Sequence, residues 1–409
     1  MAQAIGSPSW SDLPPELLGL VFLLLPTRAD RAFFPAVCRA WCSTVRQCRL
    51  PPPSPVPWLM LPDGSATSFP HRETFQLPDG MRYHNSCGEW LLLSRNDGSC
   101  LLMNHLTKAT MPLPSLSSYS YYQEPVEAPE DYIPRYYRIR GNSWLDNKDI
   151  SNISVRSLVV CSTRLVAAIV AVGPLGTIAL CRPGATAWSV SAQDECWWLS
   201  RMVFFQGKLY ALNRVAGHND DLIAVDIVDE HDSDEPRVSR IECVIEGASL
   251  PSCLELSTIR THYLIESNGT LLMIRRRFSH KSQDWSDVVC CSKFEVFEAD
   301  IEEHLWAEVR TLGTNQALFL GQGSSSAVHV SPYDLSRNCI FFLDDCTNLL
   351  IEKTTKYCRV YDMKDEKIYS PLPMVSWKSE RVPATWIFSQ GETCEAANST
   401  GGFTGNCGT

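Results

Sequence analysis

A degenerate repeat of short, strand-favouring runs limits the fold of this chain more than any other feature. Beyond residue 57, helical periodicity nearly disappears, and runs of four to seven residues alternate with turns rich in Gly, Asn, Asp and Ser. Two pairs of runs fold back about Gln206-Gly207 and Asn268-Gly269, a pattern typical of hairpins. Such spacing indicates an all-β barrel, sandwich or propeller.

The spacing between repeats can be measured from one recurring run, which ends in a polar residue. Five runs end at residues 104, 181, 226, 298 and 362, and these ends lie 77, 45, 72 and 64 residues apart. Propeller blades take about 40–50 residues, so the longer intervals must hold insertions or unrecognised blades. Trp188 and Trp306 mark two closing strands. We predict a degenerate propeller of about five to seven blades over residues 58–388, with an insertion at 115–150.

The first fifty residues have a different, helical pattern. Leu13, Leu17 and Val21 recur at helical spacing, and Pro14 suits a first turn. Pro26 ends this helix, and Pro35 suits the first turn of a third helix with Val37, Cys38 and Trp41 on one side. A module this small has no self-sufficient core, so its excess Leu, Phe and Trp indicates a partner.

The predicted organisation follows from these two patterns. We expect a flexible N-terminus over 1–9, a small all-α module over 10–49 and a Pro-rich linker over 50–57. The all-β domain follows over 58–388, and the Gly-, Ser- and Asn-rich stretch 389–409 is expected to be a disordered tail.

The net charge, the cysteine spacing and the short apolar runs argue against several classes of protein. The net charge of −10 disfavours nucleic-acid binding, which needs a basic face. None of the 17 Cys forms a C-x-x-C pair, so no zinc or redox motif is predicted, and reduced, buried thiols are expected. The apolar run 17–25 is about half the length of a membrane helix, and no signal-peptide pattern opens the chain. We therefore expect a cytoplasmic or nuclear protein with no membrane partner.

Motifs for catalysis are not found. The chain has no G-x-S-x-G, H-E-x-x-H or phosphate-loop motif, and we predict no catalytic residue, metal or cofactor. The Gly/Ser-rich stretch 321–326 indicates a loop, and Asp344-Asp345 favours a turn over cation binding. The basic cluster 275–277 is open to three interpretations: a solvated strand end, part of a partner site, or a weak nuclear signal. The Tyr-rich stretches 119–122 and 132–137 suit either a binding loop or disorder.

Three strings of the helical module follow one another at fixed gaps: Leu-Pro-x-Glu-Leu-Leu at 13–18, Leu-Pro at 25–26 with Asp-Arg at 30–31, and Val-Cys-Arg-x-Trp at 37–41. In this order and with these gaps, the module resembles an F-box. The resemblance implies docking to a Skp-family adaptor and through it to a cullin, with Trp41 as a large anchor; the alternative is that these helices only cap the rest of the chain. The implied adaptor-binding residues are Leu13, Pro14, Leu17, Val21, Leu25, Pro26, Val37, Cys38 and Trp41.

A second resemblance rests on three segments of the remainder, 88–93, 102–107 and 338–345. In these segments the chain is similar to plant F-box proteins with a C-terminal, kelch-like β-propeller of the KIB type. The combination implies a non-catalytic substrate-recognition subunit of a cullin-RING (SCF-type) ubiquitin ligase, with an unknown protein target. Two alternatives remain: an F-box scaffold that sequesters a partner outside the ligase, and a propeller enzyme with a polar central pocket.

Overall fold

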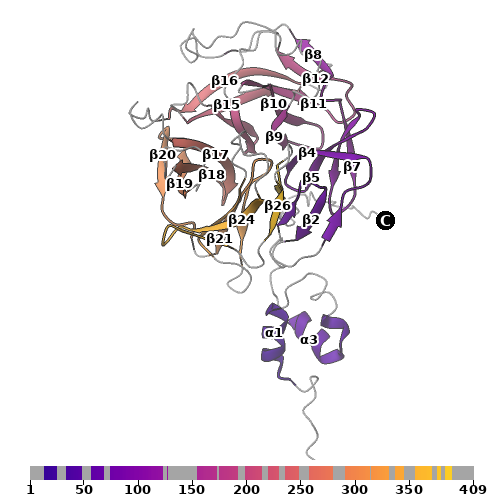
Figure 1. Cartoon of the computed structure of the whole chain (residues 1–409), viewed down its shortest axis with the longest axis vertical. Helices are drawn as coiled ribbons and strands as arrows, with labels where there is room; N and C mark the ends of the chain where they lie inside the picture. The colour runs from indigo at the N-terminus through magenta and orange to yellow at the C-terminus, as the bar shows by residue number, and fades with distance from the viewer. Residues whose placement is uncertain are drawn as a thin grey trace, which may run out of the picture.

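A computed structural model gives the fold of the chain. It describes residues 13–24, 34–47, 57–68, 74–122, 127, 154–172, 175–191, 199–213, 220–229, 235–247, 258–279, 291–313, 315–330, 337–344, 355–370, 375–378 and 383–388. Three short helices come first, and β-strands make up the rest (Figure 1).

The helical module consists of α1 (Pro15–Leu24), the 3₁₀ helix η2 (Phe34–Ala36) and α3 (Arg39–Gln47). Helix α1 begins at the second proline of the Pro14-Pro15 pair, where the missing N–H costs no hydrogen bond. The prediction that Pro35 opens the third helix is wrong. Pro35 lies in η2, and α3 starts four residues later, with the Cys42 N–H donating to the Cys38 carbonyl at 3.0 Å.

Six sheets form a ring, so the all-β domain is a six-bladed propeller (Figure 1). We number the blades by the order in which the chain enters them. Blade 1 combines the last described strand with the first three: β27 (Thr385–Ile387), β1 (Trp58–Met60), β2 (Ser65–Ser68) and β3 (Thr74–Gln76). Antiparallel pairing of β27 with β1 closes the ring.

The next two blades follow in order. Blade 2 contains β4 (Met81–Cys87), β5 (Trp90–Arg95), β6 (Cys100–Asn104) and β7 (Thr110–Leu113). Blade 3 contains β9 (Ser154–Val160), β10 (Val166–Val172), β11 (Leu175–Cys181) and β12 (Trp188–Ser191), with β8 (Tyr119–Tyr122) added in parallel outside β12.

The last three blades complete the ring. Blade 4 contains β13 (Leu199–Phe205), β14 (Lys208–Asn213), β15 (Asp221–Val228) and β16 (Arg237–Ile245). Blade 5 contains β17 (Thr258–Ser267), β18 (Thr270–Ser279), β19 (Cys291–Asp300) and β20 (Leu305–Val309). Blade 6 contains β22 (Ser326–His329), β21 (Gln316–Leu320), β23 (Cys339–Leu343), β24 (Thr355–Asp362) and β25 (Lys367–Tyr369), with β26 (Ser376–Lys378) paired to β24.

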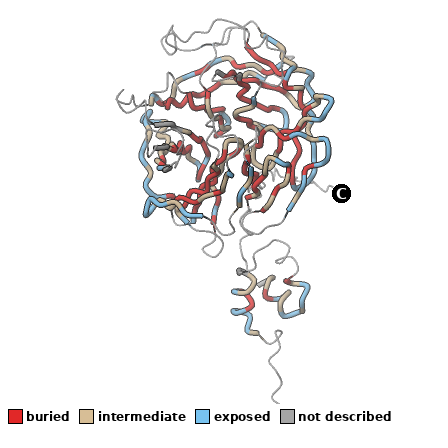
Figure 2. Tube along the Cα trace, viewed as in Figure 1, coloured by how far each residue is buried: buried red, intermediate tan, exposed pale blue. Residues whose placement is uncertain are grey.

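The core lies between the blades. Six clusters of buried apolar side chains each join two neighbouring sheets, so every junction of the ring has its own core. Figure 2 shows the consequence, with buried chain on the inner strands and exposed chain on the outer ones. This arrangement suits strands that are apolar on both faces, such as β11 and β23.

The structure contains the predicted hairpin turns, and the five run ends and the two tryptophans lie on strands at regular places in the blades. Gln206-Gly207 and Asn268-Gly269 have positive φ at both positions (48° and 81°, 51° and 79°), as a two-residue turn of the I′ kind requires. The runs ending at 104, 181, 226 and 298 are the third strand from the centre of blades 2 to 5, and the run ending at 362 lies in β24 of blade 6. Trp188 and Trp306 lie on the fourth strands of blades 3 and 5.

The predicted insertion holds a strand that the sequence did not indicate. Residues 119–122, expected to be a binding loop or disordered, form β8 on the outer edge of blade 3. Its neighbours in space come from β12, about 70 residues later in the chain, so no local pattern predicts the pairing. Tyr132 to Tyr137 lie outside the described residues.

Candidate functional site

The helical module has a small aromatic core. Leu18 and Phe34 are only 1% and 2% exposed. Phe34 contacts Phe22, with ring centres 5.0 Å apart, and stacks on Trp41 at 4.2 Å. These contacts hold α1, η2 and α3 together, and they place Trp41 inside the module, with its ring against Phe34.

Three apolar side chains of the module face outward. Leu17 and Leu20 are 47% and 49% exposed, and Val37 between η2 and α3 is 60% exposed. Leu17 and Leu20 lie three residues apart and therefore on one side of α1, whereas Leu18 is on the other. On a module this small, these side chains are available for contact with a partner. We call Leu17, Leu20 and Val37 the exposed apolar face.

The predicted adaptor-binding residues fall into three groups. Leu17 and Val37 belong to the exposed apolar face. Leu13, Val21, Cys38 and Trp41 are half-buried, and Pro14 is exposed. Leu25 and Pro26 lie outside the described residues. The sequence reasoning missed Leu20, although its spacing of three from Leu17 was a usable signal.

The centre of the propeller holds a cavity of about 580 Å³ lined by the innermost strands of blades 2 to 6. Arg201, Glu266 and His329 are part of its lining, and three of its serine hydroxyls are engaged within the propeller. Ser86 Oγ donates to the Trp386 carbonyl at 3.1 Å, and Ser157 Oγ accepts from the Met202 N–H at 3.1 Å. The Gly/Ser-rich stretch 321–326 forms a loop on this cavity, in which Ser325 Oγ donates to the Gly321 carbonyl at 3.0 Å. Burial raises the pKa of the Cys87 thiol in the wall, the opposite of what an activated thiolate needs.

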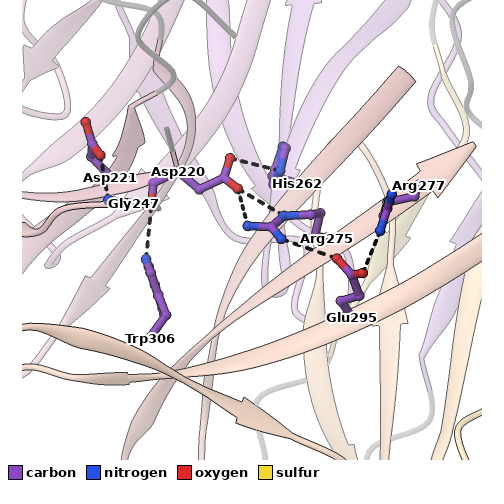
Figure 3. A network of polar contacts seen from close by, with 8 residues as sticks. All are labelled: Asp220, Asp221, Gly247, His262, Arg275, Arg277, Glu295 and Trp306. Carbon is purple, nitrogen blue, oxygen red and sulfur yellow. Dashed lines mark hydrogen bonds and ion pairs between the residues drawn. The ribbon is translucent and has the colours of Figure 1, made fainter. Parts of the chain in front are cut away.

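A cluster of linked charges lies between blades 4 and 5 (Figure 3). Asp220 bridges His262 Nε2 at 2.9 Å and Arg275 Nη2 at 2.6 Å. Arg275 continues to Glu295 at 3.3 Å, and Glu295 also binds Arg277 at 3.0 Å. The Asp220 carbonyl accepts from Trp306 Nε1 at 3.0 Å. We call these side chains the Asp220 network.

Two opposing effects set the charge of Asp220. Burial raises the pKa of its carboxyl, but the hydrogen bond from His262 and the charges of His262 and Arg275 outweigh burial and hold this pKa well below the usual value. The His262 side chain is 1% exposed, and neither it nor Asp220 lines a described cavity. The Asp220 network therefore joins blades 4 and 5 through largely buried charges.

The interpretations of the basic cluster 275–277 need correction. Its residues lie in the middle of β18, not at a strand end, and Arg276 is 2% exposed. Arg276 Nη1 donates to the Leu343 carbonyl at 2.8 Å, and its guanidinium lies 4.4 Å from the centre of the Phe342 ring.

Asp344, predicted to serve a turn, accepts from Arg359 Nε at 3.0 Å and lies 3.7 Å from Arg276. Asp345 lies outside the described residues. The acidic partners come from distant parts of the chain, which is why the cluster looked solvated in the sequence.

Metal and membrane sites can be assessed for the described residues alone. Among them, no group of three His, Cys, Asp or Glu side chains is close enough to hold a metal ion. Within the same ranges, no helix is long and apolar enough to cross a membrane.

Comparison with known proteins extends these observations. Residues 61–369 match the KIB1-4 beta-propeller family, and residues 10–52 match the F-box domain. A protein of Arabidopsis thaliana that is named as an F-box protein is 31% identical over 128 residues, which are 27% of this chain and 32% of that protein. The match thus spans about a third of the length of that relative.

Solved structures match this chain only at low identity and low TM-score. An oligogalacturonate lyase in complex with manganese has 11% identity and a TM-score of 0.31, with coverage of 80% of this chain and 82% of that one. YCF48 from Cyanidioschyzon merolae has 11% identity and a TM-score of 0.28, with coverage of 66% and 80%. These likenesses are too distant to carry functional argument. The family matches, the six blades and the helical module together show that this chain is an F-box protein that belongs to the KIB1-4 β-propeller family.

Proposed function

We propose that the chain is the substrate-recognition subunit of an SCF-type ubiquitin ligase. In this role the helical module binds a Skp-family adaptor and through it a cullin, while the propeller holds a protein target. The observation that carries the proposal is the exposed apolar face on a module that matches the F-box domain. Apolar side chains presented by a helix are the usual means of docking into a groove on a partner.

The proposed adaptor contact includes the nine residues named from the sequence and adds Leu20. Within this set, Leu17, Leu20 and Val37 contact the adaptor directly, because they are exposed. Trp41 contributes by holding Phe34 and α1 in place.

Transfer of ubiquitin is assigned to other subunits. Holding a target on a rigid receptor raises the effective concentration of its lysines near the loaded ubiquitin carrier, so no catalytic residue is required on this chain. The engaged hydroxyls of Ser157 and Ser325 and the raised pKa of Cys87 argue against a serine or cysteine nucleophile at these positions of the central cavity. Ligase subunits of this kind act in the cytoplasm or the nucleus, and we place the chain there.

Binding to a purified adaptor tests the proposal. The full chain should bind a plant Skp-family adaptor, and the Leu17→Asp, Val37→Asp variant should lose at least a hundredfold in affinity, because each change puts a charge into an apolar contact. Leu106→Asp is the matched control, since Leu106 is an exposed Leu on the propeller. Equal binding by the wild type and the double variant would reject the proposed contact.

A scaffold that sequesters its partner would pass this binding test. Turnover of the partner separates the two roles. For a substrate receptor, the half-life of the bound target should lengthen when the proteasome is inhibited, and also in cells that carry the double variant. A half-life that neither treatment changes would favour the scaffold.

A further inference from the structure

A short outer segment ties blade 3 to blade 4. Its first part, β8, pairs in parallel with β12 of blade 3. Its last described residue, Glu127, pairs in parallel with Arg240 on the outer strand of blade 4. There the Glu127 N–H donates to the Ser239 carbonyl at 3.0 Å, and the Ile241 N–H donates to the Glu127 carbonyl at 2.8 Å. We call the described residues 119–122 and 127 the strap.

Two side chains of β8 add contacts to blade 4. Ser120 Oγ donates a hydrogen bond to the carboxylate of Glu235. The Tyr122 hydroxyl accepts from the Val238 N–H at 3.1 Å. Ser120 and Tyr122 are half-buried. The attachment to blade 4 therefore consists of a few hydrogen bonds at the surface.

The attachment to blade 3 is more extensive. Trp188 is fully buried on β12, where it pairs with Tyr119 of the strap, and its backbone N–H donates to the carbonyl of Ser118, the residue before the strap, at 2.9 Å. Its indole Nε1 donates to the Pro114 carbonyl at 3.2 Å. Loss of the contacts to blade 4 would therefore leave the strap on blade 3.

The bond from Ser120 is sensitive to charge. A phosphoryl group on Ser120 would replace the donated proton by about two negative charges next to the Glu235 carboxylate. Two arginines of blades 3 and 4 already have acidic partners: Arg182 pairs with Asp229 at 2.5 Å, and Arg240 lies 3.7 Å from Glu242. Repulsion between the phosphate and Glu235 then opposes the attachment.

We propose that Ser120 is a phosphorylation site whose modification detaches the strap from blade 4. The reaction requires ATP and a serine-specific protein kinase. Ser120 Oγ forms a bond to the γ-phosphorus of ATP, the bond from that phosphorus to ADP breaks, and the hydroxyl proton passes to the base of the kinase. The detached strap frees the Ser239 carbonyl and the Ile241 N–H on the outer edge of blade 4, an edge that an extended partner segment can pair with.

Amide hydrogen exchange on the full chain tests the detachment. Phosphoserine is installed at position 120 during translation, and exchange is compared with that of the unmodified chain. The amides of Val238 and Ile241 should exchange at least tenfold faster, because both donate to the strap. The amide of Trp188 should be unchanged, because it donates to Ser118.

Two controls isolate the role of Glu235. Phosphoserine at position 118 adds the same charge two residues away, where the hydroxyl donates to the Thr186 carbonyl within blade 3, and it should leave Val238 and Ile241 protected. Glu235→Gln in the chain phosphorylated at 120 should restore most of their protection. Unchanged or stronger protection in the chain phosphorylated at 120 would overturn the proposal, as would a Glu235→Gln variant that restores nothing.

Occupancy of the site is measured on protein recovered from plant cells with phosphatase inhibitors present. Peptides that cover residues 115–122 should carry phosphate on Ser120. Full coverage with Ser120 always unmodified would also overturn the proposal.

Discussion

At the scale of single residues, the propeller relies on buried charges that satisfy one another across blades. Asp220, His262 and Arg275 join blades 4 and 5, and Arg276 reaches the Leu343 carbonyl of blade 6. A buried ion pair adds little net stability over an apolar pair, but removal of one partner leaves the other charge uncompensated. These residues are therefore costly to change one at a time.

The Asp220→Asn variant tests the Asp220 network. It should lose about 3 kcal/mol of unfolding free energy at pH 7, because Arg275 and His262 keep their donors but lose the carboxylate. The pKa of Asp220 is lower in the folded than in the unfolded chain, so its contribution is complete above the unfolded pKa of about 4 and is lost as the pH falls further. Urea unfolding at pH 3 to 7 should show the two proteins converging towards acid. A difference that is constant or grows towards acid would contradict this origin.

Gly247 tests how closely the chain packs beside Asp220. A Cβ at this position would lie 2.3 Å from the backbone nitrogen of Asp220, so Gly247→Ala must displace the backbone that holds the network. We expect a loss of about 2 kcal/mol or more in unfolding free energy. Gly184→Ala is the control, since a Cβ there meets nothing within 4 Å and only its φ of 86° is unfavourable. Equal losses in the two variants would show that crowding at Gly247 is unimportant.

Single residues also show where sequence reasoning ends. Exposure of Leu17 and Val37 was predictable, because helical spacing and the Leu-Pro and Val-Cys-Arg strings are local signals. The partners of Arg275 and Arg276 were not, because Asp220 and Asp344 lie 55 and 68 residues away in the chain. A basic cluster looks solvated until the fold brings acids to it.

At the scale of elements, the residues that pack the helical module together differ from the exposed residues that are proposed to bind the adaptor. Trp41 stacks on Phe34, whereas Leu17, Leu20 and Val37 are exposed. Adaptor affinity can therefore be lost in two ways, through the surface or through the fold of the module.

The Trp41→Ala variant distinguishes these two routes. It should unfold the module, because the module has little other core, and loss of a packed aromatic costs about 3 kcal/mol. Far-ultraviolet circular dichroism should show less helix, while the thermal midpoint of the propeller is unchanged. Leu17→Asp should weaken adaptor binding while the helix content stays full. A Trp41→Ala variant that keeps its helix would place Trp41 in direct contact with the adaptor instead.

Elements differ in how far the sequence predicts them. The hairpins at Gln206-Gly207 and Asn268-Gly269 follow from turn chemistry, and the five runs identify blades 2 to 6. The repeat did not predict blade 1, because the strands of this blade come from both ends of the domain. Its third strand from the centre, β2 (Ser65–Ser68), also lacks an apolar run. β8 was missed because its parallel pairing with β12 depends on the ring.

At the scale of the whole molecule, a few contacts close the ring. β27 brings the end of the domain back to β1, and Trp386 is fully buried. Thr385 Oγ1 lies at the junction: it accepts from the Ser324 N–H of blade 6 at 3.1 Å and lies 3.0 Å from Ser86 Oγ of blade 2. One hydroxyl thus connects three blades.

Thr385→Val tests the closure. The change keeps the shape of the side chain but leaves the Ser324 N–H buried without its acceptor, which costs about 1–3 kcal/mol. Guanidinium unfolding should show a single transition at a lower midpoint, because each blade depends on the closed ring. A second transition confined to the variant would mean that blades unfold separately, and an unchanged midpoint would show that this junction is not needed for closure.

The central claim is that one chain joins a ligase through its helices and a target through its propeller. Proximity labelling in plant cells tests it most directly, with the intact chain compared with the Leu17→Asp, Val37→Asp variant. The account predicts that adaptor and cullin disappear from the labelled set of the variant, while the proteins labelled next to the propeller remain and accumulate. Adaptor labelling that persists in the variant, or propeller neighbours that vanish together with the adaptor, would contradict it.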